Sequence, residues 1–519
     1  MSQPSPRPPG ILGWIEETGN RLPDPVFIFL WLILIVVACS AAASLLGLSA
    51  IHPTQMQADG TPLVVEAASL LSADNIQRLL VQMPTTFTHF HPLGYVLVVM
   101  LGAGVAERSG LFATVMSSAV KAAPSALLTP VVALLAMMGN LAADAAYVVL
   151  IPLAGVTFAA AGRHPLAGIA AGFAGVSGAF SANLLPGQLD ALLFGITEAA
   201  VVTLDSSWVM NIAGNWYFIA VMTFVFLPII WYLTDKVIEP RLAHYAIDTE
   251  GSAAASLRDG EQALSDTERR GLMRAGLAAL AVIGIWIFLC FSPGTPLINE
   301  EGGPARMQPL YQSLVAGFFV LFLACGWAYG SATGSVKSHR DVVRMMSEAM
   351  ADLSYYLVLA FAAAHFVAMF NWSNLGLIIA INGASLIDSA ALPLPMLAGL
   401  MIVLVALTNL FIGSASAKWA LIAPVIVPML MLLGISPEMA TAAYRVGDGA
   451  SNIITPLMPY FPLILAFCQR WSPQFGLGSL VAMMVPYSVW LLLSGMVLAV
   501  LWMVVGAPLG PGAEIRYAL

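Results

Sequence analysis

One cluster of charged residues stands between long apolar runs of this 519-residue chain. The stretch 444–452 reads YRVGDGASN and holds Arg445 and Asp448, three positions apart. Charged side chains in a lipid bilayer cost at least a few kcal/mol, so they are rare there and usually functional. We expect Gly447 and Gly449 to interrupt the helix, which would expose carbonyls to a cation and amides to an anion. The alternative is that Arg445 and Asp448 pair with each other and only stabilise the fold.

A second interrupted stretch, SANLLPGQLD at 181–190, ends on Asp190. Asp190 and Asp448 are therefore the candidates for binding a proton or a coupling ion. A buried aspartate beside an arginine stays ionised more easily than a lone one, so Asp190 is the better candidate for carrying a proton. The alternative is that Asp190 is a solvated residue or a helix cap.

Asparagines mark the expected tips of two apolar hairpins, Asn140 in the first half of the chain and Asn409 in the second. Asparagine, carboxylate and backbone oxygens together suit a hard cation, and unwound membrane helices are known to bind sodium with such groups. We predict a sodium site made by Asn409, Asp448 and Asn452. Asn183 is the position in the first half that matches Asn452.

Lys418 and Trp419 follow the second tip directly. Trp419 could stack on an aromatic substrate, and Lys418 could pair with a carboxylate. The alternative is that the two residues anchor the chain at the membrane surface, where tryptophan and lysine are common.

The composition excludes several classes of protein. The chain is 59% hydrophobic and only 9% charged, with a mean hydropathy of +0.87, whereas soluble domains are about 25% charged. A soluble enzyme, a disordered chain and a nucleic-acid-binding protein are therefore excluded, and a lipid bilayer is the expected surrounding. The sequence also lacks a nucleotide-binding loop, an HExxH motif and a serine elbow, so we predict no enzyme activity and no cofactor beyond a possible sodium ion.

Basic residues orient the apolar runs, because loops rich in lysine and arginine stay in the cytoplasm. The loops 234–272 and 330–345 are basic and are predicted to be cytoplasmic. The loops 49–92 and 292–309 have one arginine each and are predicted to lie outside. The N-terminal segment, 1–25, is then cytoplasmic.

An internal repeat divides the chain into two copies, each a hairpin followed by a broken helix, at 125–204 and 395–470. Spacings of 43 and of 13 positions recur in both copies, between Asn140 and Asn183, Asn409 and Asn452, Pro152 and Pro165, and Pro424 and Pro437. The charge pattern gives the copies opposite orientations, which is typical of secondary transporters. We predict one all-α membrane domain, 1–519, with about nine transmembrane helices and two re-entrant hairpins. The run 375–392 should lie at the interface or extend the preceding helix.

The stretches GNLAADAAYVVLIPLAG, AGFAGVSGAFSANLLPGQLDALLFGIT, GSASAKWALIAPVIVPM and AAYRVGDGASNIITPLMPYFPLIL resemble the p-aminobenzoyl-glutamate transporter (AbgT) family. The resemblance covers almost the whole chain. It implies a homodimeric, multi-pass carrier of the bacterial inner membrane, driven by an ion gradient. The family's site residues fall on Asp190, Asn409, Ser416, Trp419, Pro437, Arg445, Asp448 and Pro456.

The resulting hypothesis is a secondary transporter of small aromatic anions. It would export p-aminobenzoate-like compounds and sulfonamide antimetabolites by proton antiport, with Arg445, Ser416 and Trp419 at the substrate. Uptake of p-aminobenzoyl-glutamate coupled to protons or sodium is the alternative within the class, and a passive anion channel is the alternative outside it.

Overall fold

The computed structural model describes the chain from Pro25 to Ala518 with short gaps, which are 57–60, 143–145, 243–246, 248–263, 292–293, 300–305, 307, 390–391, 456–457 and 459. Nearly all of the segment 1–25, the middle of the loop 234–272 and the predicted site residue Pro456 thus lie outside the described residues.

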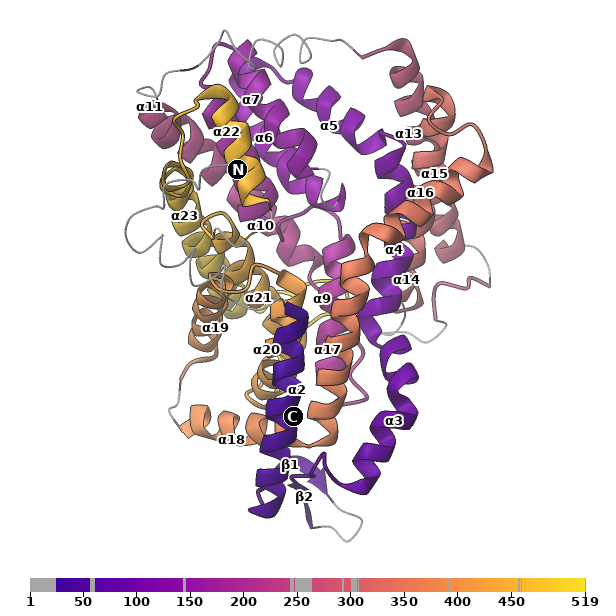
Figure 1. Cartoon of the computed structure of the whole chain (residues 1–519). Helices are drawn as coiled ribbons and strands as arrows, with labels where there is room; N and C mark the ends of the chain where they lie inside the picture. Colours follow the sequence, from indigo (N-terminus) through magenta and orange to yellow (C-terminus); the bar gives the residue numbers. More distant parts are fainter. Residues whose placement is uncertain are drawn as a thin grey trace, which may run out of the picture.

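Long apolar helices dominate the fold (Figure 1). Within the described residues, eight helices are long and apolar enough to cross a membrane, and there are nine if one bent pair, Leu111–Val120 with Ser125–Leu141, counts as a span. About 20 apolar residues are needed for one crossing, so the prediction of about nine spanning segments is confirmed. The eight are Val26–Leu45, Ala73–Arg108, Trp216–Leu242, Asp266–Phe291, Leu314–Thr333, Ser354–Trp372, Ala415–Leu432 and Leu477–Val505.

The first copy of the repeat is a helix pair followed by a helix with a long interruption. The interruption follows a π-helical turn and covers 179–187, where Pro186 and Gly187 disfavour helix. The helix resumes at Gln188, and Asp190 accepts a hydrogen bond from the Gly187 backbone at its start. The elements are α6 (Leu128–Met138), α7 (Ile151–Ala160), α8 (Pro165–Phe173), the π-helix η4 (Ala174–Gly178) and α9 (Gln188–Val201).

The second copy has the same order of elements. Ser414 and Ser436 cap the starts of its second and third helices, and Pro437 occupies the first turn of the third, where its missing N–H costs nothing. Its third helix ends at Asn452, and its fourth begins at Phe461. The elements are α19 (Leu394–Asn409), α20 (Ala415–Leu432), α21 (Pro437–Asn452) and α22 (Phe461–Trp471).

Helix α21 is continuous, so the prediction that Gly447 and Gly449 interrupt it is wrong. A Cβ atom on Gly447 would lie 2.5 Å from the carbonyl oxygen of Ile402 in α19, and one on Gly449 would lie 3.1 Å from that of Gly178. The glycines therefore allow close packing of α21 against α19 and against the π-helix η4 of the first copy. Because every residue of α21 is buried, its backbone groups are best satisfied inside a helix.

The remaining elements surround the two copies. The predicted outside loop 49–92 contains an unexpected antiparallel pair of strands, β1 (Ser49–Met56) and β2 (Pro62–Glu66). Helix α18 (Leu375–Ser389) is separate from the helix before it and lies across the end of the bundle in Figure 1. The others are α2 (Pro25–Leu45), α3 (Ala73–Thr88), α4 (His91–Arg108), α5 (Leu111–Lys121), α10 (Trp216–Tyr232), α13 (Asp266–Phe291), α15 (Leu314–Thr333), α16 (His339–Asp352), α17 (Ser354–Trp372) and α23 (Leu477–Val505).

Candidate functional site

Arg445 of α21 joins the two copies of the repeat through an ion pair with Asp190 of α9. Its Nη2 lies 2.7 Å from Oδ1 of Asp190, and its Nε donates to Oδ1 of Asn215 at 3.1 Å. The other carboxylate oxygen of Asp190 accepts from the Gly187 N–H at 2.7 Å. Both charges are buried, with residue exposures of 3% and 5%. Removal of either partner would thus leave an uncompensated buried charge.

A partly open polar cavity adjoins this ion pair, and its volume of about 240 Å³ includes open solvent. Its polar walls are Asp190, Asn211, Asn215, Glu438, Thr441 and Arg445. A guanidinium group has the planar, two-pronged geometry that recognises carboxylates. The cavity thus holds one group suited to an acidic ligand, and Asp190 is the carboxylate that such a ligand would replace.

Lys418 of α20 forms a second buried ion pair, with Asp448 of α21. Its Nζ lies 2.5 Å from Oδ1 of Asp448 and also donates to Oδ1 of Asn409. Oδ1 of Asn452 accepts from the Asn409 amide at 2.8 Å. Each of the three residues predicted to bind sodium thus has a side-chain oxygen that already accepts from a protein donor. A sodium ion does not fit among them while Lys418 keeps this position, and we derive no transport step through one.

The two charges of α21 therefore point to different partners. Arg445 pairs with Asp190, and Asp448 pairs with Lys418. The alternative in which Arg445 and Asp448 neutralise each other is wrong, because each has an opposite charge on a neighbouring helix. Lys418, considered above for a substrate carboxylate, has Asp448 as its partner.

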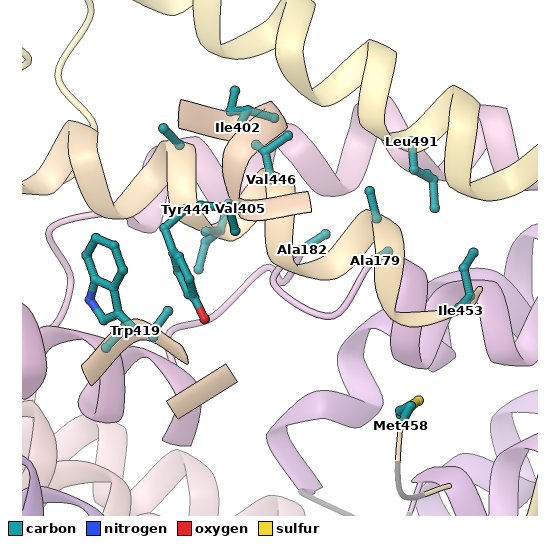
Figure 2. Packing of buried hydrophobic residues seen from close by; sticks show 14 of the residues in the cluster. Ala179, Ala182, Ile402, Val405, Trp419, Tyr444, Val446, Ile453, Met458 and Leu491 are labelled. Atoms are coloured by element: carbon teal, nitrogen blue, oxygen red, sulfur yellow. The ribbon is translucent and has the colours of Figure 1, made fainter. Parts of the chain in front are cut away.

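Trp419 is fully buried, and its indole N–H donates to Oγ1 of Thr197 at 2.9 Å. Its ring packs against Tyr444, with 4.4 Å between the ring centroids (Figure 2). In this conformation Trp419 is therefore neither at a membrane surface nor open to a substrate. Ser416 is half-buried instead. It lines a second cavity of about 260 Å³ with mostly apolar walls.

The two cavities lie on opposite faces of α9. Asp190 and Phe194 line the polar cavity, whereas Leu192 and Ile196 line the apolar one. Two positions along an α-helix correspond to about 200° of rotation, which accounts for the opposite faces.

The predicted asparagines of the first copy differ from those of the second. Asn183 is buried; its amide donates to the Met137 carbonyl at 3.3 Å and its side-chain oxygen accepts from the Leu185 N–H at 3.2 Å. Both polar side-chain atoms of Asn140 are buried and have no hydrogen-bond partner among the described residues.

Sequence reasoning missed several residues of the polar cavity, Asn215 and Glu438 among them. Glu438 has a signal that could have been found, because Glu438, Thr441 and Arg445 are spaced i, i+3 and i+7 and so form one stripe along α21. Asn215 has no such signal. It reaches the cavity from the loop before α10, and its amide donates to the Glu438 carbonyl at 2.9 Å.

A family model described as the AbgT putative transporter family matches residues 10–517. This chain belongs to the AbgT family. It is a membrane transporter and not an enzyme, and the sequence-based assignment is confirmed. Every site residue carried over from the family falls within the matched range.

Relatives with known names or structures agree with this assignment. The chain is 35% identical to the p-aminobenzoyl-glutamate transport protein of Escherichia coli (strain K12), over 98% of this chain and 97% of that one. The crystal structure of the Alcanivorax borkumensis YdaH transporter, which has an unusual topology, matches with a TM-score of 0.87 at 41% identity, over 94% of this chain and 100% of that one. The structure of Neisseria gonorrhoeae MtrF, described as illuminating a class of antimetabolite efflux pumps, matches with a TM-score of 0.90 at 40% identity. The match covers 97% of this chain and 100% of that one.

Proposed function

We propose that this AbgT-family transporter exports p-aminobenzoate-like compounds, including sulfonamide antimetabolites, in exchange for protons. The observation that carries the proposal is the buried Arg445 beside a cavity, with Asp190 as its ionic partner at 2.7 Å. A substrate carboxylate can take the place of Asp190 on the guanidinium group, because both ligands are carboxylates of the same geometry. The apolar side chains of Phe194, Met210 and Ile212 provide walls for an aromatic ring.

Two relatives support the substrate class. The Escherichia coli relative is named for p-aminobenzoyl-glutamate transport, and MtrF is described with antimetabolite efflux pumps. p-Aminobenzoate, p-aminobenzoyl-glutamate and sulfonamides all contain a 4-aminophenyl ring joined to an acidic or strongly polar group. A cavity with one cationic residue and apolar walls fits this shared chemistry.

Membrane vesicles of both orientations test the direction of transport. Everted vesicles that pump protons inward should accumulate labelled p-aminobenzoate, and an uncoupler should release it. Accumulation in right-side-out vesicles alone would favour the second candidate, the uptake of p-aminobenzoyl-glutamate. Equilibration without accumulation in both orientations would favour a passive anion channel.

Other parts of the hypothesis stay proposals. We propose a homodimer in the bacterial inner membrane with a cytoplasmic N-terminus and without a nucleic-acid partner. Among the residues proposed for substrate binding are Ser416, Trp419 and Pro437; Pro437 occupies the first turn of α21. Asp190 and Asp448 are proposed for coupling, and both have cationic partners in this conformation.

A further inference from the structure

Glu438 is a buried acid without an ionic partner in the polar cavity. It occupies the first turn of α21 and is 2% exposed. Its Oε1 accepts from the indole N–H of Trp208 at 3.3 Å, while its Oε2 is buried without a hydrogen-bond partner among the described residues. An unpaired carboxylate costs several kcal/mol to bury, so such a group is stable as a neutral acid or as a carboxylate that a ligand satisfies.

The other two buried acids of the site differ from Glu438 in this respect. Asp190 accepts from Arg445 and from a backbone N–H. Asp448 accepts from Lys418 and from the hydroxyl of Tyr444. Glu438 is thus the acid of this group that can gain or lose a proton without breaking an ion pair.

Glu438 and Arg445 lie at two ends of one cavity wall. They are seven positions apart on α21, which is two helical turns or about 10 Å along the axis, with Thr441 between them. A molecule with an acid at one end of a benzene ring and an amine at the other has complementary groups for both. Its acid would meet the guanidinium of Arg445, and its amine would donate to the carboxylate of Glu438.

Few other charges surround Glu438. Asp190 of α9 and Arg445 of α21 line the cavity. Trp208, which donates to Glu438, packs against Tyr517, and the Tyr517 hydroxyl donates to Asp205 at 2.9 Å. The C-terminal segment also carries two exposed charged residues, Glu514 and Arg516. Glu438 is thus surrounded mainly by uncharged groups, and its side-chain donor is the indole of Trp208.

We propose that Oε2 of Glu438 is a shared site for the aryl amine of the substrate and for the coupling proton. The ionised carboxylate accepts a hydrogen bond from the amine. A proton that adds to Oε2 turns this atom into a hydroxyl donor and removes its charge, so the amine is held more weakly. The only bond that forms or breaks is the O–H bond of Glu438, whose proton comes from water on one side of the membrane and leaves to the other. Because the proton and the amine each weaken the binding of the other, the site favours the exchange of one for the other. This inference rests on the proposed function and specifies its substrate class as 4-amino-substituted aromatic acids.

Equilibrium binding to the purified full-length protein in detergent tests the proposal. Benzoate has the carboxylate but lacks the amine, so it is the matched probe for p-aminobenzoate. We expect p-aminobenzoate to bind about tenfold more tightly than benzoate at pH 8, which is the usual effect of one hydrogen bond to a charged group. This preference should shrink as the pH falls to 6. A wild-type preference that is absent, or that does not change with pH, overturns the proposal without any variant.

Three variants separate the two roles of the carboxylate. Glu438→Gln is neutral at every pH, as the protonated acid is, so its preference for p-aminobenzoate should be as small at pH 8 as that of the wild type at low pH and should not change with pH. Glu438→Leu should lose the preference and still bind benzoate. Glu514→Gln changes an exposed acid nearby and should behave as wild type. A pH-dependent preference in folded, monodisperse Glu438→Gln overturns the assignment. If neither compound binds the wild-type protein at either pH, the proposed function itself fails.

Discussion

The two copies of the repeat differ most at the tips of their hairpins. In the second copy, Asn409, Lys418 and Asp448 form one buried hydrogen-bonded group that contains a complete ion pair. When the copies are aligned on their shared asparagines and prolines, Ala146 stands where the second copy has Lys418, and Ala179 stands where it has Asp448. The second copy therefore contains an internal ion pair, whereas the described residues at the matching positions of the first copy are uncharged.

This difference makes the contact between the two copies asymmetric. The first copy contributes Asp190, whose positive partner Arg445 comes from the second copy. Asn140, at the first tip, has buried polar atoms without a partner among the described residues. A charge pair between the copies can open when they move relative to each other, whereas a pair within one copy moves with it. We therefore assign ligand exchange to Arg445–Asp190, whereas Lys418–Asp448 stabilises the second copy and takes no part in ligand binding.

The third helix of each copy is also anchored differently. In the first copy, Arg163 precedes α8 and lies 2.5 Å from carboxylate oxygens of both Asp235 and Glu239. In the second copy, the backbone before α21 pairs with the C-terminal segment, where the Ser436 N–H donates to the Ile515 carbonyl at 2.9 Å. Side-chain charges thus secure one helix start, and backbone hydrogen bonds secure the other.

The largest effect is expected from breaking the internal pair of the second copy. Lys418→Ala leaves Asp448 buried and unpaired, so the free energy of unfolding should fall by about 3–5 kcal/mol. Replacing both partners by apolar residues of similar size, Lys418→Met with Asp448→Leu, should cost much less. Thermal unfolding in detergent would compare the variants. A single and a double variant of equal stability would contradict the structural role.

A smaller effect is expected from adding a methyl group at matching glycines of the two copies. A Cβ on Gly447 would lie 2.5 Å from a backbone carbonyl oxygen of α19, which cannot move alone. A Cβ on Gly178 would meet the Ile453 side chain at 2.9 Å, which can rotate. Gly447→Ala should therefore destabilise the protein by about 1–3 kcal/mol, and Gly178→Ala by less. The same unfolding assay checks the order, and the reverse order would show that α19 and α21 are not closely packed.

A still smaller effect is expected at the anchor of the first copy. Arg163 is 19% exposed, so solvent and salt screen its contacts with Asp235 and Glu239. Arg163→Ala should cost about 1–2 kcal/mol, and the loss should shrink at high salt. The matched control is Arg344→Ala on α16, whose side chain is 61% exposed and should contribute little. Equal losses in the two variants would contradict the anchor.

The smallest effect is a pH dependence at Asp205, which accepts a hydrogen bond from Tyr517 of the C-terminal segment. Burial alone would raise the pKa of Asp205. Hydrogen bonds from Ser207 and from the Tyr517 hydroxyl lower it by more than burial raises it, so the pKa lies below its ordinary value. Asp205 therefore adds stability above its unfolded-state pKa, and this stability is lost as the pH falls through the folded-state pKa. Tyr517→Phe should reduce this loss in acid. Identical acid unfolding curves for the variant and the wild type would exclude the contribution.

Much of the architecture could be predicted from the sequence. The lengths of the apolar runs predicted the spanning helices. The recurrent spacing of 43 positions predicted that the two copies have the same order of helices. In the second copy this spacing corresponds to a direct hydrogen bond of 2.8 Å between Asn409 and Asn452. Such features are local or periodic, so a single sequence can reveal them.

The pairing of the charges could not be predicted in the same way. Arg445 and Asp190 are 255 positions apart, and no local pattern selects Asp190 over Asp448 as the partner. The glycines of α21 were misread because a glycine in a helix indicates either a break or a close approach, and only the position of α19 decides between them. The strands β1 and β2 lie in a stretch that was predicted only to be outside and polar.

Binding of labelled p-aminobenzoate to two purified variants tests the central claim most directly. One variant is Arg445→Gln, and the other is the double variant Lys418→Met with Asp448→Leu. If ligands exchange at Arg445–Asp190, the Arg445→Gln protein should lose saturable binding, while the folded double variant should bind as wild type does. Binding that survives in Arg445→Gln and disappears in the double variant would contradict the account and place the substrate at Lys418.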